Sequence, residues 1–170
     1  RQAQRLAQLT AVLGNVAYDN DPLTDTLAVR DPELLGTDET LTAHRVRLGG
    51  RTLAVLLGAV APDGYSSAIR LLIAIGADGR VLGVRVLEHR ETPGLGDFIE
   101  ARRSDWIHGF AGRSLADPPP AGWQVRKDGG EFDQFTGATV TPRAVVGAVR
   151  DALTYFERHR AELLAEPPAP

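Results

Sequence analysis

Four short apolar stretches, joined in two pairs by glycine-containing turns, constrain the fold of this chain more than any other feature. The first pair flanks Gly49-Gly50, and the second pair flanks a turn that contains Asp78-Gly79. Apolar stretches separated by turns of this kind are typical of β-hairpins. The sequence therefore predicts two antiparallel hairpins, formed by residues 43–48, 52–60, 68–75 and 81–89.

A different pattern, with the spacing of one face of a helix, begins near residue 141. Its apolar residues are Val145, Val146, Val149, Ala152, Leu153 and Phe156. Thr141 stands where an N-cap is expected, and Pro142 at the first helical position. A long helix after several strands predicts an α+β fold, in which helices pack against an antiparallel sheet.

The remaining segments carry weaker patterns. Residues 2–16 have apolar side chains along one side and are predicted to form an amphipathic helix. Residues 19–40 are rich in Asp and Pro and are predicted to be a loop with short turns. Residues 98–110 are predicted to be helical with a break near Arg103-Ser104, and residues 123–127 to form a short strand.

One domain accounts for most of the chain. A length of 170 residues with 43% hydrophobic residues is enough for one core, which we assign to residues 19–165. Residues 1–18 contain the N-terminal helix, and residues 166–170 form a proline-rich tail that we expect to be flexible. No apolar run approaches the ~18–20 residues that a membrane span needs.

Composition excludes several functional classes. A net charge of −3 provides no basic field that would attract nucleic acid. The absence of cysteine excludes a disulfide framework, an iron–sulfur cluster and a cysteine-ligated zinc site. The sequence also lacks the serine-hydrolase elbow, the dinucleotide fingerprint and the P-loop lysine. No metal site is predicted, because the four histidines are scattered: His44, His89, His108 and His159.

Small residues and hydroxyls are concentrated just before the predicted C-terminal helix, in the run Asp-Gln-Phe-Thr-Gly-Ala-Thr-Val-Thr-Pro at 133–142. Gly137 and Ala138 allow close approach to the backbone, and Thr139 places a hydroxyl where the helix start would stabilise an anion. The run therefore predicts a phosphate site. The alternative is that Thr136, Thr139 and Thr141 serve only as turn and capping residues.

A second glycine-containing loop, Glu-Thr-Pro-Gly-Leu-Gly-Asp at 91–97, follows the last predicted strand. Pro93 stiffens the backbone, while Gly94 and Gly96 permit close contacts that side chains would block. Such a loop suits contact with a flat ring; the alternative is an ordinary turn between two elements. Glu88 and Glu91, beside this turn, could orient a cofactor, but charged residues next to a turn are usually solvated, and we assign neither a role as an acid or base.

Together these runs resemble one known family. Thr136-Gly-Ala-Thr139, preceded by Asp133, and the 91–96 loop resemble motifs of the FMN-binding domain shared by the G subunit of the Rnf electron-transport complex and the C subunit of the sodium-translocating NADH:quinone reductase. Further similarity at 64–66 and 104–107 lies in the expected order, and the resemblance covers residues 60–156 well. Asp97 and residues 132–135 are more similar to the Rnf G subunit.

The resemblance implies that FMN is attached through its phosphate, as a phosphoester, to Thr139. A separate flavin transferase, working on FAD with magnesium, would load this threonine and recognise Asp133 and Gly137. The chain would then carry electrons without being a catalyst on its own, and we predict no catalytic residue. The predicted cofactor-binding residues are Thr139, Thr136, Gly137, Ala138, Thr141, Glu91, Thr92, Gly94, Leu95 and Gly96.

The family also implies a location and partners. A single membrane helix before residues 1–18 would hold the domain on the periplasmic side of the inner membrane, beside other membrane subunits of the complex. Three alternatives remain open: a domain like the sodium pump's C subunit, a cofactor-free extracytoplasmic binding module, and a stand-alone flavin reductase. Trp106 and Trp123 are candidates to flank a flavin, although tryptophans are more often core or rim residues.

Overall fold

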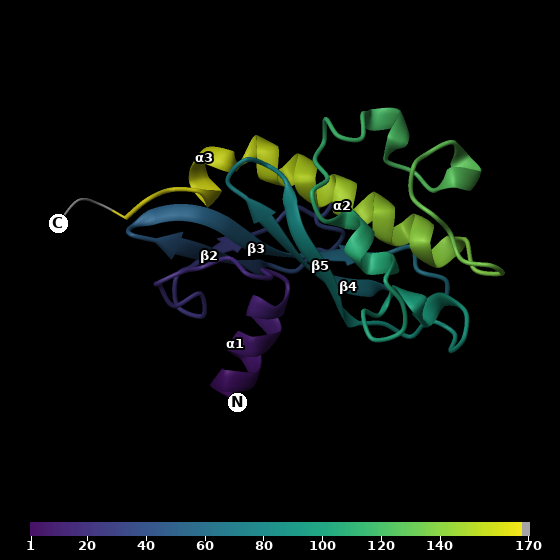
Figure 1. The fold of residues 1–170 in the computed structure, drawn as a ribbon, viewed down its shortest axis with the longest axis horizontal. Helices are drawn as coiled ribbons and strands as arrows, with labels where there is room; N and C mark the ends of the chain where they lie inside the picture. The colour runs from purple at the N-terminus through teal and green to yellow at the C-terminus, as the bar shows by residue number, and fades with distance from the viewer. Residues whose placement is uncertain (168–170) are drawn as a thin grey trace.

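Each strand of a single antiparallel sheet pairs with the next strand along the chain in the computed structural model, which describes residues 1–167. The third predicted segment, the tail at 166–170, therefore lies partly outside the described residues. The α+β fold class is confirmed (Figure 1). The strands are β1 (Thr26–Val29), β2 (Leu41–Leu48), β3 (Arg51–Ala61), β4 (Ile69–Gly76) and β5 (Val81–Glu88).

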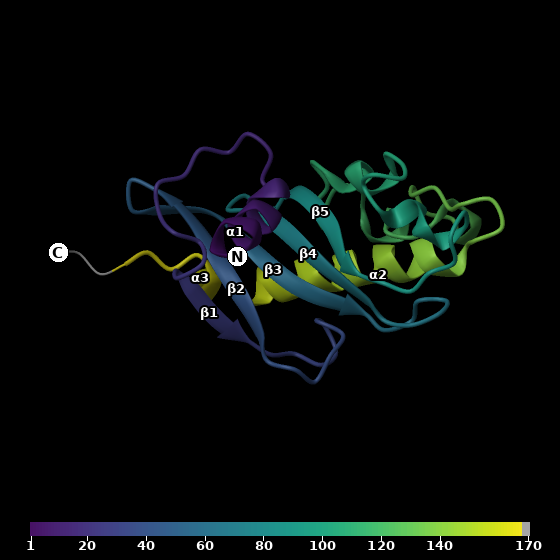
Figure 2. The ribbon, with the colours of Figure 1, turned by 90° about the horizontal axis from the view of Figure 1, so that it is seen from below.

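Helix α2 (Val140–Arg158) lies across one face of this sheet and buries the apolar face that the sequence predicts. The opposite face is covered by the segment that follows α1 (Gln2–Ala11), as the view from below shows (Figure 2). Because both faces are covered, β3 and β4 are buried along nearly their whole length instead of alternating. These two strands therefore form the centre of the core.

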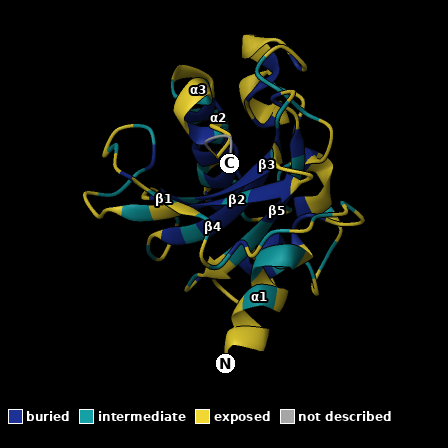
Figure 3. Ribbon diagram, turned by 90° about the vertical axis from the view of Figure 1, so that its left-hand side faces the viewer, coloured by how far each residue is buried: buried dark blue, intermediate teal, exposed yellow. Residues whose placement is uncertain are grey.

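The predicted helix at 2–16 ends earlier, at Ala11. Val12 and Leu13 leave the helix and pack against Leu56 and Leu72 on the second face of the sheet. None of the residues of α1 itself is buried, and the helix projects away from the sheet (Figure 3). No helix within residues 1–167 is both long and apolar enough to cross a membrane.

Two other local predictions are wrong, and a third is confirmed only in part. The predicted loop at 19–40 contains β1, which has a single buried residue, Val29, and is too short to leave a pattern. The segment 98–110 forms two 3₁₀ helices, η1 (Gly96–Ile99) and η2 (Trp106–Phe110), separated near the predicted break. In place of a strand at 123–127, Val125 makes one bridge to Phe132 and a short 3₁₀ helix, η4 (Arg126–Asp128), follows.

Residues 123–135 are held in place by aromatic packing and not by a β-strand. The rings of Phe110 and Phe132 stack 4.9 Å apart, and Trp123, which is 1% exposed, packs against both. Trp106 packs edge-on against Phe135, 5.3 Å away, and its indole N–H donates to the carbonyl of Asp133 at 2.8 Å. Trp123 is therefore a core residue, while Trp106 holds the loop that leads into α2.

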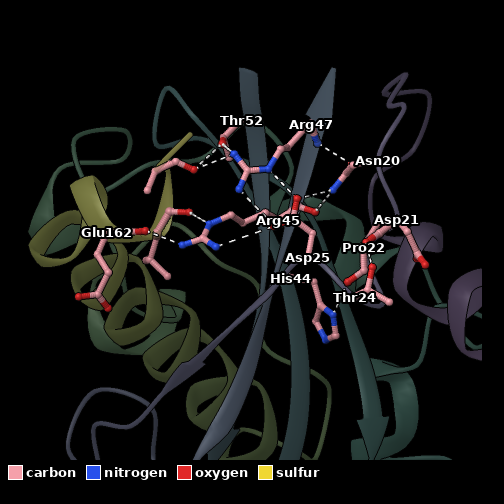
Figure 4. Close-up of polar contacts among 12 residues, drawn as sticks. Asn20, Asp21, Pro22, Thr24, Asp25, His44, Arg45, Arg47, Thr52 and Glu162 are labelled. Carbon is pink, nitrogen blue, oxygen red and sulfur yellow. Dashed lines mark hydrogen bonds and ion pairs between the residues drawn. The ribbon is translucent and has the colours of Figure 1, made fainter. Parts of the chain in front are cut away.

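At the opposite end of α2, two arginines of β2 tie the segment before β1 and the end of α3 to the sheet (Figure 4). Arg47 donates to both carboxylate oxygens of Asp25, at 2.6 and 3.2 Å, and to the carbonyl of Ala165 at 2.7 Å. Arg45 donates to carbonyls at the end of α3 (Arg160–Leu163). We call Asn20, Asp25, Arg45, Arg47 and Thr52 the β2 arginine cluster.

The charge of Asp25 is set within this cluster. The hydrogen bond from Arg47 is the largest influence and, with one from Asn20, outweighs burial and lowers the pKa of Asp25 below its usual value. The carboxylate therefore stabilises the fold at neutral pH, and this contribution is lost as the pH falls through the lowered pKa.

Candidate functional site

A tight turn precedes α2 and presents the predicted phosphate motif. The N–H of Ala138 donates to the carbonyl of Phe135 at 3.1 Å, and Gly137, the third residue of this turn, has φ of 77°. A side chain is strained in that conformation, which type II turns require at their third residue. The chain then enters α2 with Thr139 as the N-cap residue.

The prediction that Thr141 is the N-cap and Pro142 the first helical residue is wrong, because α2 begins at Val140. Thr141 is 1% exposed, and its hydroxyl donates to Oε1 of Glu91 at 2.5 Å, so the hydroxyl is not available for capping. Pro142 occupies the third helical position, where a missing N–H costs nothing because the first N–H groups of a helix have no partner within it.

Thr139 is in the opposite situation. Its side chain makes no capping hydrogen bond within the described chain, although it is the N-cap residue. The residue is half-buried, beside the unpaired N–H groups and positive end of α2. Of these two threonines, then, Thr141 has its hydroxyl committed to a buried partner, and Thr139 has a hydroxyl that a ligand can reach.

Glu91 lies behind the site. Only 4% of its surface is exposed, so the expectation that it is solvated is wrong. Besides the bond from Thr141, its Oε1 accepts the N–H of Tyr65 at 2.8 Å, and its Oε2 accepts the N–H of Ser66 at 2.9 Å. Burial is the largest influence and raises the pKa of Glu91, but the three hydrogen bonds and the nearby His89 lower it, and the net result is a pKa below its usual value. The carboxylate is therefore charged at neutral pH.

The loop that carries Glu91 is held by its own hydrogen bonds. The N–H of Glu91 donates to Nδ1 of His89 at 3.0 Å, and Nε2 of the same ring donates to Glu100 at 2.7 Å. This pair of contacts assigns the histidine a proton on Nε2. Farther along the loop, the N–H of Gly94 donates to buried Asp97 at 2.8 Å. The loop backbone is therefore well defined.

The two predicted segments lie side by side in the structure. A Cβ on Gly96 would lie 2.6 Å from Oγ1 of Thr141 and 2.9 Å from Cβ of Glu91. A Cβ on Gly137 would lie 3.5 Å from Cδ2 of Leu95. Gly96 therefore lets the 91–97 loop approach the start of α2 more closely than any side chain would allow.

A pocket of about 330 Å³ opens between these segments. Of the predicted cofactor-binding residues, Thr136 lies on the exposed turn, Glu91 behind the wall and Gly94 on the outer part of the loop. The others line the pocket, together with Tyr65 and Val140, which the prediction missed. The lining residues are Tyr65, Thr92, Leu95, Gly96, Gly137, Ala138, Thr139, Val140 and Thr141.

An apolar rim borders this pocket. Within residues 1–167 the exposed large apolar side chains are few, and three of them, Tyr65, Leu95 and Val140, surround the opening. The signal for Tyr65 in the sequence was its place in the 64–66 segment, which resembles the family. A larger hollow of about 830 Å³ lies between residues 32–38 and α2, but of the two motifs it includes only Val140. It is therefore not the site that the motifs predict.

Comparison with known proteins agrees with this geometry, since the model of the FMN-binding domain matches residues 64–154, which contain both motifs. The chain belongs to the FMN-binding domain family. It is 56% identical to the G subunit of the ion-translocating oxidoreductase complex of Pseudomonas aeruginosa, over 96% of this chain and 78% of the relative. The corresponding G subunits of Cereibacter sphaeroides and Shewanella oneidensis are 53% and 44% identical, over 96% and 98% of this chain and 72% and 79% of the relatives. The resemblance to the Rnf G subunit is confirmed.

The close contact at Gly96 in this FMN-binding domain leads to a stability prediction. Gly96→Ala is expected to lower the free energy of unfolding by about 1–3 kcal/mol, because the new methyl group must displace Thr141 or Glu91. Urea denaturation measures the change. Gly109→Ala is the matched control, since a Cβ there meets no atom within 4 Å; equal losses for both variants would contradict the proposed crowding.

The buried carboxylate of Glu91 leads to a prediction about how the stability of the domain depends on pH. The pKa of Glu91 is lowered in the folded state, so its stabilising contribution is complete above its unfolded-state value and is lost as the pH falls through the folded value. We expect Glu91→Gln to be less stable than wild type at neutral pH and to differ little from it under strongly acidic conditions. Denaturation midpoints across this range test the prediction; a constant difference between the two proteins would refute it.

Proposed function

We propose that this chain is the electron-transfer subunit of an Rnf-type ion-translocating oxidoreductase complex and carries FMN as a phosphoester on Thr139. The observation that carries the proposal is the difference between the threonines at the start of α2. The hydroxyl of Thr141 is bound to Glu91, whereas that of Thr139 makes no capping bond, and Thr139 lines the pocket. Family membership supports FMN as the cofactor.

The residues present fit the phosphate of FMN. Thr139 stands at the N-terminus of a 19-residue helix, where unpaired N–H groups and the helix dipole favour an anion. Gly137, in the turn two residues earlier, has no side chain that would block the approach of a phosphate to the backbone. A phosphoester on Thr139 would therefore retain its negative charge in a favourable environment.

The residues present also fit a flat ring system. Tyr65, Leu95 and Val140 provide apolar surface at the mouth of the pocket, and Gly96 and Gly137 allow close approach to the backbone. The pocket is small and bordered by exposed side chains, so part of a bound ring would stay open to a redox partner. Bound FMN would supply the electron-accepting and electron-donating chemistry, and the protein would hold and orient it.

Loading of Thr139 would depend on a partner enzyme. In the transfer from FAD, a bond forms between Oγ1 of Thr139 and the phosphorus on the flavin side, the bond between the two phosphates breaks, AMP leaves, and the hydroxyl proton is released. The buried carboxylate of this site, Glu91, already accepts hydrogen bonds on both oxygens. The base and the magnesium are therefore assigned to the flavin transferase, which is consistent with a chain that is not a catalyst on its own.

We place this protein at the inner membrane, with its domain on the periplasmic side. The relatives are named as subunits of ion-translocating complexes, which supports membrane subunits as partners. Helix α1 projects from the domain with none of its residues buried, which supports a juxtamembrane role for residues 1–18. The side of the membrane can be tested by labelling a cysteine introduced on α1 with a membrane-impermeant reagent.

The cofactor proposal is tested by co-expressing the chain with a flavin transferase. The flavin should survive denaturation and migrate with the polypeptide, and peptide mass spectrometry should find the mass of FMN less one water on Thr139. An established acceptor domain loaded by the same transferase is the control. Loss of the flavin on denaturation, while the control keeps its flavin, would contradict the phosphoester on Thr139. Absence of flavin from the native protein as well would favour a cofactor-free binding module.

A further inference from the structure

Glu91 joins three parts of the candidate site that are far apart in the sequence. It belongs to the loop after β5, accepts the hydroxyl of Thr141 in the first turn of α2, and accepts two successive backbone N–H groups, from Tyr65 and Ser66, in the loop between β3 and β4. Its partner in α2 is 50 residues away along the chain. No other described carboxylate connects these three segments.

The hydrogen bonds of Glu91 connect it to two parts of the pocket wall, Tyr65 and the start of α2. Tyr65 is 72% exposed and lines the pocket, yet its backbone N–H is bonded to Glu91 in the interior. The position of its ring at the pocket mouth therefore depends on a buried contact. On the other side, Thr141 is two residues from Thr139, so the same carboxylate also sets where α2 begins relative to the loop.

We propose that Glu91 is a positioning residue of the flavin site, which holds Tyr65 over the pocket and Thr139 in register with the 91–97 loop without itself contacting the cofactor. The proposal rests on the proposed function, because it concerns the geometry that FMN attachment requires. Glu91 is absent from the pocket lining, and its oxygens are engaged by Thr141, Tyr65 and Ser66.

The test replaces the carboxylate without changing its size. In Glu91→Gln, the new NH₂ group must face an N–H or O–H donor whichever way the amide is turned, because both carboxylate oxygens accept hydrogen bonds from donors. Two measurements are made. In flavin-free protein, hydrogen exchange of the Tyr65 and Ser66 amides should become faster by roughly tenfold. With purified transferase, FAD and magnesium, attachment should slow by roughly tenfold to a hundredfold, because a small misplacement of a reacting group has an effect of that size.

A third measurement reports on the ring. Once loaded, the flavin of Glu91→Gln should be more accessible to iodide quenching than that of wild type, since Tyr65 no longer has a defined position. Thr141→Val removes one donor and should shift all three measurements in the same direction, whereas Thr141→Ser keeps the hydroxyl and should restore them toward wild type. If Glu91→Gln does not fold, amide exchange at Tyr65 and Ser66 in flavin-free Thr141→Val decides the question, because Thr141 itself lines the pocket and its effect on attachment could be direct.

Asp25→Asn is the matched control. It also removes a partly buried, hydrogen-bonded carboxylate, but at the far end of α2, a helix about 28 Å long. Equal slowing in Asp25→Asn would show that general stability is responsible and would overturn the proposal. Wild-type attachment rate and quenching in Glu91→Gln would overturn it as well. If wild type itself takes up no flavin, the proposed function fails, while amide exchange at Tyr65 still decides whether Glu91 holds this loop.

Discussion

Replacing Thr139 with valine is expected to abolish covalent flavin attachment. Valine has nearly the shape of threonine but no oxygen that can form a phosphoester, so the denatured polypeptide should show no flavin fluorescence after co-expression with the transferase. The fold should change little in stability, because the Thr139 hydroxyl makes no capping bond whose loss would cost the usual ~1 kcal/mol. In-gel fluorescence and a urea denaturation curve measure the two effects.

Thr154→Val provides the control for this substitution. Thr154 is in the same helix and bonds the carbonyl of Arg150 at 3.1 Å, away from the pocket. This variant should be loaded as well as wild type. Fluorescence that persists in Thr139→Val would show that the attachment lies elsewhere, with Thr136 and Thr141 as the next candidates; Thr141 would first have to release its bond to Glu91.

Replacing Arg47 with methionine is expected to lower the free energy of unfolding by about 3 kcal/mol, at the lower end of the range for breaking a buried ion pair. The arginine side chain is 9% exposed, and its loss leaves Asp25 without its strongest partner and the carbonyl of Ala165 without the arginine donor. The expected loss of unfolding free energy is at the lower end because Asp25 is 25% exposed and keeps its hydrogen bond from the side-chain amide of Asn20.

The pH dependence distinguishes this explanation from a simple loss of packing. In wild type, the lowered pKa of Asp25 means that stability falls as the pH drops through that pKa, and Arg47 is the main cause of the lowering. The acid sensitivity should therefore be weaker in Arg47→Met. Arg51→Met, at an exposed position at the start of β3, is the control. A similar loss of stability in both variants would contradict the role of the β2 arginine cluster.

Secondary structure could be predicted where the signal is local. The two hairpins are recovered with small changes at their ends, since Gly49-Gly50 and Asp78-Gly79 mark the turns and the flanking residues are apolar. Helix α2 is recovered because its buried face follows helical spacing. The edge strand β1 was missed, because four residues with one buried side chain leave no detectable pattern.

Other errors arise where distant contacts override local preference. Residues 12–16 continue a helical pattern but leave the helix, since Val12 and Leu13 are buried against the second face of the sheet. Residues 123–127 have the composition of a strand, yet Trp123 packs with Phe110 and Phe132 instead of joining a β-ladder. In both segments the free energy of burial against a distant partner outweighs a weak local propensity.

The sequence by itself determined the antiparallel α+β fold, the position of α2 and the two motifs that mark an FMN-binding domain, because turns, helical periodicity and short motifs are encoded by neighbouring residues. Only the tertiary structure decided which hydroxyl near the start of α2 is committed to the interior. Thr139 and Thr141 are both plausible caps in the sequence. The difference between them comes from Glu91, a buried residue that precedes Thr141 by 50 positions in the chain. A buried charge must be hydrogen-bonded, so it takes the hydroxyl of Thr141 and leaves that of Thr139 accessible at the end of the helix.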